Sequence, residues 1–180
     1  MSPLAQRAWA ALEVVPDPEI PVVSIRELGI LRGVRECDDG QSVEVVITPT
    51  YNGCPAMEQI ADDVRAALSA QGITGTVVTQ LAPAWTTDWI GPEAREKLRR
   101  YGIAPPQPAA CSSEALSGSS PGSARVLQFA PRRNAHAVPI ACPLCGSHNT
   151  TETSHFGSTA CKALMRCLDC LEPFDYFKPY

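Results

Sequence analysis

The sequence lacks the motifs of several common functional classes. Its 180 residues contain no phosphate-binding glycine-rich loop, no G-x-S-x-G nucleophile elbow and no H-E-x-x-H helix. No histidine occurs in residues 1–104, which excludes a cysteine–histidine dyad within that region. No apolar run approaches the roughly 18 residues of a membrane span, and the N-terminal stretch lacks the long apolar region of a signal peptide. We therefore expect a soluble, cytoplasmic protein with no membrane partner.

The sequence also lacks a strong charge of one sign. Fifteen basic and nineteen acidic side chains give a formal net charge of −4, and hydrophobic residues make up 44 %, enough for a folded core. Residues 139–180 hold three basic and four acidic side chains, three minus four giving a net charge of −1. A nucleic-acid-binding module normally presents a basic face. We expect no nucleic-acid partner, and a nucleic-acid-binding ribbon is the weaker alternative.

Proline and cysteine are abundant and unevenly placed. The chain has seventeen prolines and eight cysteines, and five of the cysteines fall in the last 39 residues. Residues 104–123 contain four prolines, six serines and one charged residue, too little apolar surface to offset the entropy of ordering. This pattern predicts a first domain at 1–104, a linker at 105–138 with one short strand at Arg125–Phe129, and a cysteine-rich module at 139–180.

Periodicity predicts a small α+β first domain. Apolar residues recur at helical spacing in two segments, a third segment is a short charged helix, and β-branched residues mark the strands. In chain order the expected elements are a helix at 4–12, strands at 30–36 and 42–48, a helix at 57–68, a strand at 74–81 and a helix at 92–101. The two first strands form a hairpin through Asp38–Gly40. The expected order is α-β-β-α-β-α.

The last domain contains two C-x2-C knuckles separated by 21 residues. Two cysteines at this spacing can turn both sulfurs towards one ion, and four thiolates close a tetrahedral shell with no open position. The spacing predicts a structural zinc ribbon, with an iron–sulfur site or four unmetallated thiols as alternatives. Gly146 suits a turn with positive φ after the first knuckle. The predicted zinc ligands are Cys142, Cys145, Cys167 and Cys170.

Two further cysteines are candidates for chemistry. Cys54 precedes Pro55, which fits the first position of a helix, so we expect the Cys54 thiol near the helix N-cap, where free N–H groups lower its pKa. A cysteine that only packs at the turn is the alternative. Cys161 is expected to be a small buried side chain on a ribbon strand, or else a redox or transfer thiol favoured by the charge of Lys162.

Other residues have plain structural interpretations. Asp17 and Glu19 lie in the Pro-bracketed loop Asp17–Pro21, where turn chemistry alone can explain both carboxylates. Trp85 and Trp89 follow the third predicted strand and are expected to serve as core or contact surface.

These segments resemble a known family. The loops D-P-E-I-P (Asp17–Pro21), T-P-T-Y-N-G-C-P (Thr48–Pro55) and A-P-A-W-T-T-D-W (Ala82–Trp89) resemble the α+β domain of iron–sulfur cluster assembly factors of the SufT and metal–sulfur-cluster biosynthesis type. The tail segments Cys142–Ser147, Phe156–Leu164 and Cys167–Lys178 are similar to one branch, the D subunits of phenylacetyl-CoA epoxidase systems. The resemblance covers both domains and leaves out mainly the linker.

The resemblance implies an accessory role in aerobic phenylacetate degradation. The expected task is to mature iron or an iron–sulfur cluster, or to deliver it to the oxygenase or its reductase, and these other epoxidase subunits are the expected partners. By the same resemblance, Cys54, Asp17, Glu19 and Thr48 are transfer candidates for transient iron or cluster, with Cys161 as an additional thiol. The chain lacks the two Glu-x-x-His motifs of a di-iron bundle and a dinucleotide motif, so it is not expected to perform the oxygenation. A structural bridging subunit is the alternative.

Overall fold

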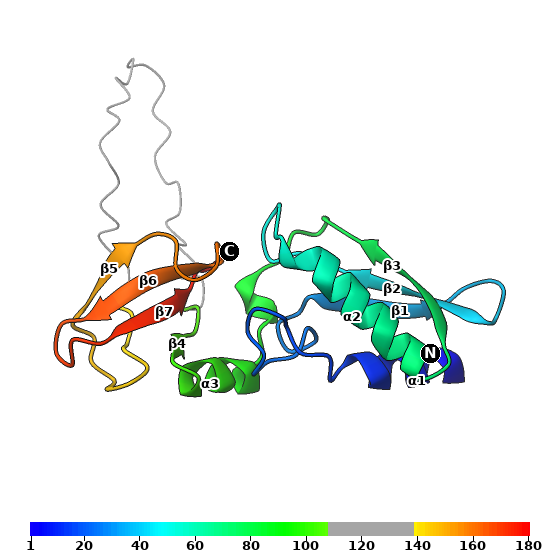
Figure 1. Ribbon diagram of the computed structural model, residues 1–180, viewed down its shortest axis with the longest axis horizontal. Coiled ribbons are helices and arrows are strands. Elements are labelled where there is room, and N and C mark those ends of the chain that lie inside the picture. Colours follow the sequence, from blue (N-terminus) through cyan, green and yellow to red (C-terminus); the bar gives the residue numbers. More distant parts are fainter. Residues whose placement is uncertain (108–138) are drawn as a thin grey trace, which may run out of the picture.

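The computed structural model describes residues 1–107 and 139–180 (Figure 1). The predicted strand at Arg125–Phe129 and most of the predicted linker lie outside the described residues. The expected boundary at residue 104 stays a prediction. The elements in chain order are α1 (Pro3–Leu12), β1 (Leu31–Glu36), β2 (Ser42–Ile47), α2 (Ala56–Ala70), β3 (Thr74–Thr79), the short 3-10 helix η1 (Thr87–Trp89), α3 (Pro92–Arg100), β4 (Ile103–Ala104), β5 (Thr150–Ser154), β6 (Lys162–Cys167) and β7 (Pro173–Phe177).

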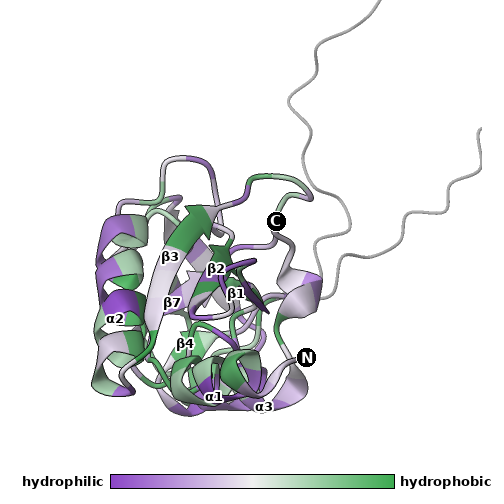
Figure 2. Ribbon diagram, turned by 90° about the vertical axis from the view of Figure 1, so that its right-hand side faces the viewer, coloured by the Kyte–Doolittle hydropathy of each residue, from purple (hydrophilic) through white to green (hydrophobic). Residues whose placement is uncertain are grey.

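The first domain has the expected α+β architecture. Its sheet has the order β1-β2-β3, with β1 antiparallel and β3 parallel to β2. The parallel pair needs a crossover, which α2 supplies. In Figure 2, α2 turns its hydrophobic side towards the sheet and its hydrophilic side outwards. The side chains that α2 buries, four residues apart on one face, are Ala56, Ile60, Val64 and Leu68.

Glycine sets the distance between α2 and the sheet. A Cβ atom on Gly75 of β3 would lie 2.5 Å from Cδ1 of Leu68 and 3.0 Å from Cγ2 of Val43. The missing side chain therefore lets α2 pack closely on β3. The sequence predicts Gly72 as the end of α2, and the structure agrees, because Gly72 has a φ of +65° just beyond it.

The ribbon forms a second sheet of order β4-β7-β6-β5. Strand β4 comes from the chain before the predicted linker and pairs in parallel with β7, while β5, β6 and β7 pair antiparallel. Periodicity does not predict β4, because two residues are too few to show a pattern. In Figure 1, α3 and β4 lie between the first sheet and the ribbon strands.

The two sheets share part of one hydrophobic core. Phe177 of β7 is 1 % exposed and belongs to the core of the first domain, with its ring 5.9 Å from that of Trp85. Near the C-terminus the Tyr180 carbonyl accepts a hydrogen bond from the Thr87 N–H at 3.3 Å. The ribbon is therefore docked against the first domain, and this contact positions the site described below.

Candidate functional site

The loop between β2 and α2 presents Cys54 at the start of a helix. The structure corrects the expected register by one residue, since α2 begins at Ala56 and Pro55 is its N-cap. Cys54 lies one position further out and is half-buried. Gly53 has a φ of +86°, a value that favours glycine and shapes the turn before the thiol. The N–H of Ala56 donates to the Cys54 sulfur.

The electrostatic expectation for Cys54 is wrong. Burial raises the pKa of the Cys54 thiol, and the nearby charges of Glu19 and Asp17 raise it further. The hydrogen bonds from the Ala56 N–H and the Tyr51 hydroxyl act in the opposite direction but do not prevail. The helix start is present, but desolvation and two carboxylates outweigh it.

A small pocket brings together several of the predicted site residues. Its lining includes Asp17, Glu19, Thr50, Cys54 and Cys161, and its free volume is about 10 Å³, close to the minimum for one water molecule. Asp17 and Glu19 come from the loop after α1, Thr50 and Cys54 from the loop before α2, and Cys161 from the ribbon. The pocket therefore lies where the two parts of the chain meet.

Asp17 performs the turn chemistry that the sequence indicates. Its Oδ1 accepts hydrogen bonds from the N–H groups of Glu19 at 3.0 Å and Ile20 at 2.8 Å. The side chain is nevertheless 95 % buried, since its exposed fraction is 5 %. Burial raises the pKa of Asp17, and burial together with Asp17 raises that of Glu19. The carboxylates are held in the pocket by the same loop geometry that explains their presence.

Cys161 lies directly before β6 and is buried. Of the two interpretations, burial is confirmed, because its exposed fraction is 4 % and it packs in the core of the first domain. Lys162 favours the thiolate as expected, but its effect is too small to prevail: burial raises the pKa of Cys161, and the lowering effects of Thr159 and Lys162 are smaller. The Thr159 hydroxyl lies 3.0 Å from the Cys161 sulfur.

Thr48 is not in this pocket. It is buried and lines a separate hollow of about 380 Å³, together with Tyr51, Trp85 and Tyr180. Thr50, two residues along the same loop, lines both spaces. Sequence reasoning missed Thr50, although it stands within the motif Thr48–Pro55, because nothing in the motif distinguishes the two threonines.

The two tryptophans differ in burial. Trp85 is 5 % exposed, and its Nε1 donates to the Leu28 carbonyl at 2.9 Å, so it is a core residue. Trp89 is partly buried, and the Arg32 guanidinium stacks over its ring at 3.4 Å from the centroid.

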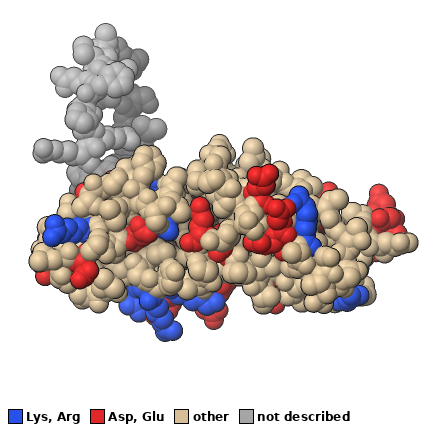
Figure 3. All heavy atoms as spheres, viewed as in Figure 1, with Lys and Arg blue, Asp and Glu red and all other residues tan. Residues whose placement is uncertain are grey.

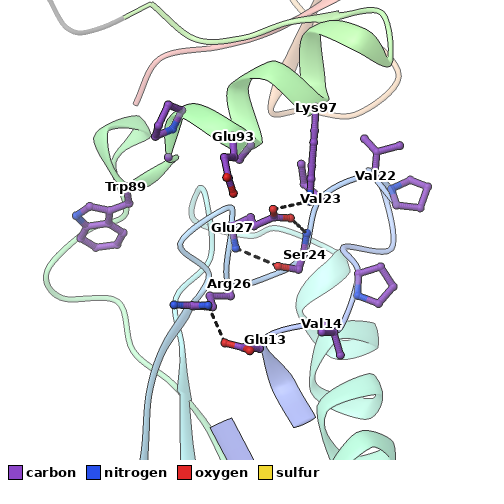
Figure 4. A pocket seen from close by; sticks show the side chains of 15 residues that line it. Glu13, Val14, Val22, Val23, Ser24, Arg26, Glu27, Trp89, Glu93 and Lys97 are labelled. Atoms are coloured by element: carbon purple, nitrogen blue, oxygen red, sulfur yellow. Dashed lines mark hydrogen bonds and ion pairs between the residues drawn. The ribbon is translucent and has the colours of Figure 1, made fainter. Parts of the chain in front are cut away.

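A more spacious pocket elsewhere contains none of the predicted site residues. It has a volume of about 790 Å³ and lies between α3 and the loops after α1 (Figure 4). Four of its five charged side chains form ion pairs, Arg26 with Glu13 at 2.7 Å and Lys97 with Glu27 at 2.5 Å, and the fifth is Glu93. The small pocket at Cys54 is the better candidate, because among the described residues its carboxylates, Asp17 and Glu19, form no such ion pairs.

The four knuckle cysteines form a preassembled centre. All four Sγ atoms lie within 4.8 Å of one another, with Cys142 and Cys170 at 3.8 Å and Cys145 and Cys167 at 3.6 Å. A tetrahedral centre with zinc–sulfur bonds of about 2.3 Å places its sulfurs about 3.8 Å apart. The donor set and its geometry therefore fit a structural metal. Gly146 has the expected positive φ, +79°.

Hydrogen bonds around this centre join the two knuckles. Asn149 donates to Asp169 at 2.7 Å, and the Ser147 hydroxyl donates to the other oxygen of the same carboxylate. N–H groups of Cys170 and Asp169 lower the pKa of Cys167 to about 7. These contacts fix the ligand loops around the metal, the usual task of groups surrounding a metal's ligands.

Acidic side chains gather on the molecular surface near the Cys54 pocket. In Figure 3 they lie over α2 and on the side of it that faces the ribbon. Such a field attracts cations.

In the described parts of the chain, no helix combines the length and the apolar character needed to cross a lipid bilayer.

Comparison with known proteins identifies both parts of the chain. Residues 5–80 match a family described as iron–sulfur cluster assembly protein, and residues 128–178 match the PaaD zinc beta ribbon domain. The putative D subunit of the 1,2-phenylacetyl-CoA epoxidase of Escherichia coli is 46 % identical over 178 residues, 98 % of this chain and 93 % of that protein. An Fe-S protein maturation auxiliary factor of Porphyromonas gingivalis is 37 % identical over 89 residues, 48 % of this chain and 83 % of that protein. The Fe-S protein maturation auxiliary factor YitW of Bacillus subtilis is 33 % identical over 98 residues, 54 % of this chain and 88 % of that protein.

Proposed function

The chain belongs to the family of the putative D subunits of 1,2-phenylacetyl-CoA epoxidase, and we propose that it is an accessory component of the phenylacetyl-CoA epoxidase system of phenylacetate degradation. Its task is to assemble the iron or iron–sulfur centre of the oxygenase or of its reductase, or to deliver iron or a cluster to one of them. Its partners are these other subunits. The identity along nearly the whole chain supports the system, and the match of residues 5–80 to iron–sulfur cluster assembly proteins supports the task.

One observation carries the proposal: a single pocket holds Cys54 together with Asp17 and Glu19. Thiolate sulfur is a ligand that iron–sulfur centres prefer, and carboxylates add negative charge for a cation. Because burial and the nearby carboxylates raise the pKa of the Cys54 thiol, iron must displace its proton when it binds, which weakens binding and suits cargo that is released again. The half-buried position of Cys54 leaves it open to a partner. Thr48 lies in the neighbouring hollow, and its part in transfer stays a prediction.

The ribbon has a different task in this proposal. Cys142, Cys145, Cys167 and Cys170 hold one zinc ion, which is structural because four thiolates leave no open position for a reaction. The ribbon then serves as a docking module. Three exposed leucines support this role, each inside or directly after a knuckle: Leu144, Leu168 and Leu171.

The maturation task can be tested in cells that express the other epoxidase subunits. They are produced with the wild-type chain, with Cys54→Ala or with Cys37→Ala, a matched thiol control outside the pocket. We expect the purified reductase or oxygenase to lose most of its iron only with Cys54→Ala, and the reductase its acid-labile sulfide too. Equal iron and sulfide contents with all three chains would contradict the proposal.

A structural bridge between oxygenase and reductase is the second candidate function, favoured by the same exposed leucines. It predicts that the chain co-purifies with the other subunits in a fixed ratio and that Cys54→Ala supports full epoxidase activity. Replacing Leu144, Leu168 and Leu171 with serine would then break the complex.

A further inference from the structure

Cys161 shares the pocket with Cys54, although it belongs to the ribbon. Its side chain packs with the core of the first domain, whereas the four knuckle cysteines surround the metal centre. Both thiols line this one small pocket, whose free volume is about 10 Å³. The docked ribbon therefore supplies a second sulfur to a site that the first domain alone would leave with one.

The position of Cys161 is fixed by several contacts. The Lys178 N–H donates to the Cys161 carbonyl at 3.0 Å, and Lys162, the next residue, is 4 % exposed and 3.5 Å from Asp175. Phe177, which lines the same pocket, anchors the ribbon against the ring of Trp85. These contacts hold Cys161 at the pocket where the ribbon meets the first domain.

The donor set of the pocket is incomplete. Among the described residues, the knuckle cysteines are the one group of three or more possible ligands whose donor atoms all lie within 4.8 Å of one another. Cys54, Cys161, Asp17 and Glu19 thus do not form a closed resident site. The free volume of about 10 Å³ admits one ion and has no room for a cluster with its sulfides.

We propose that Cys161 is the second thiol ligand of the transfer site, so that the docked ribbon and the first domain together bind a single thiophilic divalent cation between Cys54 and Cys161. This inference rests on the proposed function, whose cargo it specifies as one ferrous ion in the docked state. Binding converts two thiols into two metal-bound thiolates, and their two protons pass to the solvent. The remaining coordination positions stay open to the donor or acceptor.

The test uses the full chain with zinc bound to the ribbon and Co²⁺ as the probe. In a Cys37→Ser, Cys111→Ser background, Cys54 and Cys161 are the two thiols outside the ribbon centre. We expect one Co²⁺ to bind with sulfur-to-cobalt charge-transfer absorption and to release about two protons. With Cys161→Ser we expect about one proton, about half the absorption and an affinity at least about tenfold weaker, because even groups around a metal's ligands contribute 10–100-fold.

The outcomes separate the two proposals. A Cys161→Ser chain that still releases two protons and keeps its affinity would overturn the inference, while loss of binding with Cys54→Ser would leave the proposed function standing. If the parent chain binds no Co²⁺ beyond its zinc, the inference fails, and the iron and sulfide contents of the partner subunits still decide the proposed function.

A second measurement needs no substitution of Cys54 or Cys161. Phenylarsine oxide reacts with two neighbouring thiols, forming two As–S bonds and releasing one water. In the parent chain we expect one arsenical that joins the Cys54 and Cys161 peptides in a mass spectrum after digestion. If no arsenical links the Cys54 peptide to the Cys161 peptide, the inference is also overturned. Zinc content and melting temperature confirm that each variant retains its ribbon.

Discussion

The ribbon centre and the Cys54 pocket use the same sulfur chemistry but differ in how completely the fold assembles their ligands. In the ribbon, two knuckles on neighbouring turns bring four sulfurs to 3.6–3.8 Å for the closest pairs. In the pocket, two thiols and two carboxylates come from three separate segments and leave the coordination incomplete. The first arrangement holds a metal permanently, and the second suits an ion that arrives and leaves.

The two parts of the chain also differ in what stabilises them. The first domain buries a large aliphatic core, whereas the core of the ribbon is small and includes two of the knuckle cysteines. A unit of this size cannot fold on hydrophobic burial alone. The ribbon therefore depends on its metal and on docking, and the first domain depends on neither to the same degree.

The largest expected effect comes from removing the metal. Cys142→Ala should abolish zinc binding and unfold the ribbon, because binding at such sites is worth about 10–16 kcal/mol of folding free energy. The helices of the first domain should remain. Zinc content and backbone NMR spectra of residues 1–107 and 139–180 measure the two effects. A ribbon that keeps its dispersed signals without zinc would remove the proposed difference between the two parts.

Phe177→Ala should produce the next largest effect. Phe177 is buried in the shared core, and truncating a buried Phe costs about 3–5 kcal/mol. We expect the ribbon to detach while keeping its zinc, so that Cys161 becomes reactive towards iodoacetamide. Leu171→Ala, at a side chain that is 59 % exposed, is the control and should change stability by less than about 0.5 kcal/mol. A chain that loses zinc with Phe177→Ala would show that docking and metal binding are inseparable.

The smallest effect concerns the pH dependence of the pocket. The folded protein raises the pKa of Asp17 above its value in the unfolded chain, mainly through burial. The native state therefore holds the proton more tightly, and stability falls as the pH rises from the unfolded pKa near 4 to the folded one. Asp17→Asn keeps an acceptor oxygen for the Glu19 and Ile20 N–H groups without a charge.

In Asp17→Asn, the free energy of unfolding should not show the part of this pH-dependent decrease that Asp17 causes. Urea unfolding at pH 4 and pH 7 measures the free energy of unfolding of both proteins. If wild type lost no more stability than Asp17→Asn over this interval, the raised pKa would be contradicted, and the pocket would be electrostatically ordinary.

Much of the fold could be predicted from local sequence patterns. The helix that became α2 shows its buried face at a four-residue spacing, and the hairpin of β1 and β2 has its turn at Asp38–Gly40. The knuckles could be predicted because each pair of ligands is close in sequence. Strand β4 could not, because its partner β7 lies on the far side of the predicted linker.

The sequence by itself determined the main helices and strands of the first domain, the four cysteines of the ribbon centre and the identity of the candidate thiols. Only the tertiary structure decided that Cys161 meets Cys54, that Thr50 rather than Thr48 shares their pocket, and that both thiols have raised pKa values. The physical reason is that the pKa of a thiol depends on its solvent exposure and on the charges around it. The exposure of Cys54 and the charges around it are set by the distant segment that covers the start of α2. The sequence near Cys54 does not show which segment that is.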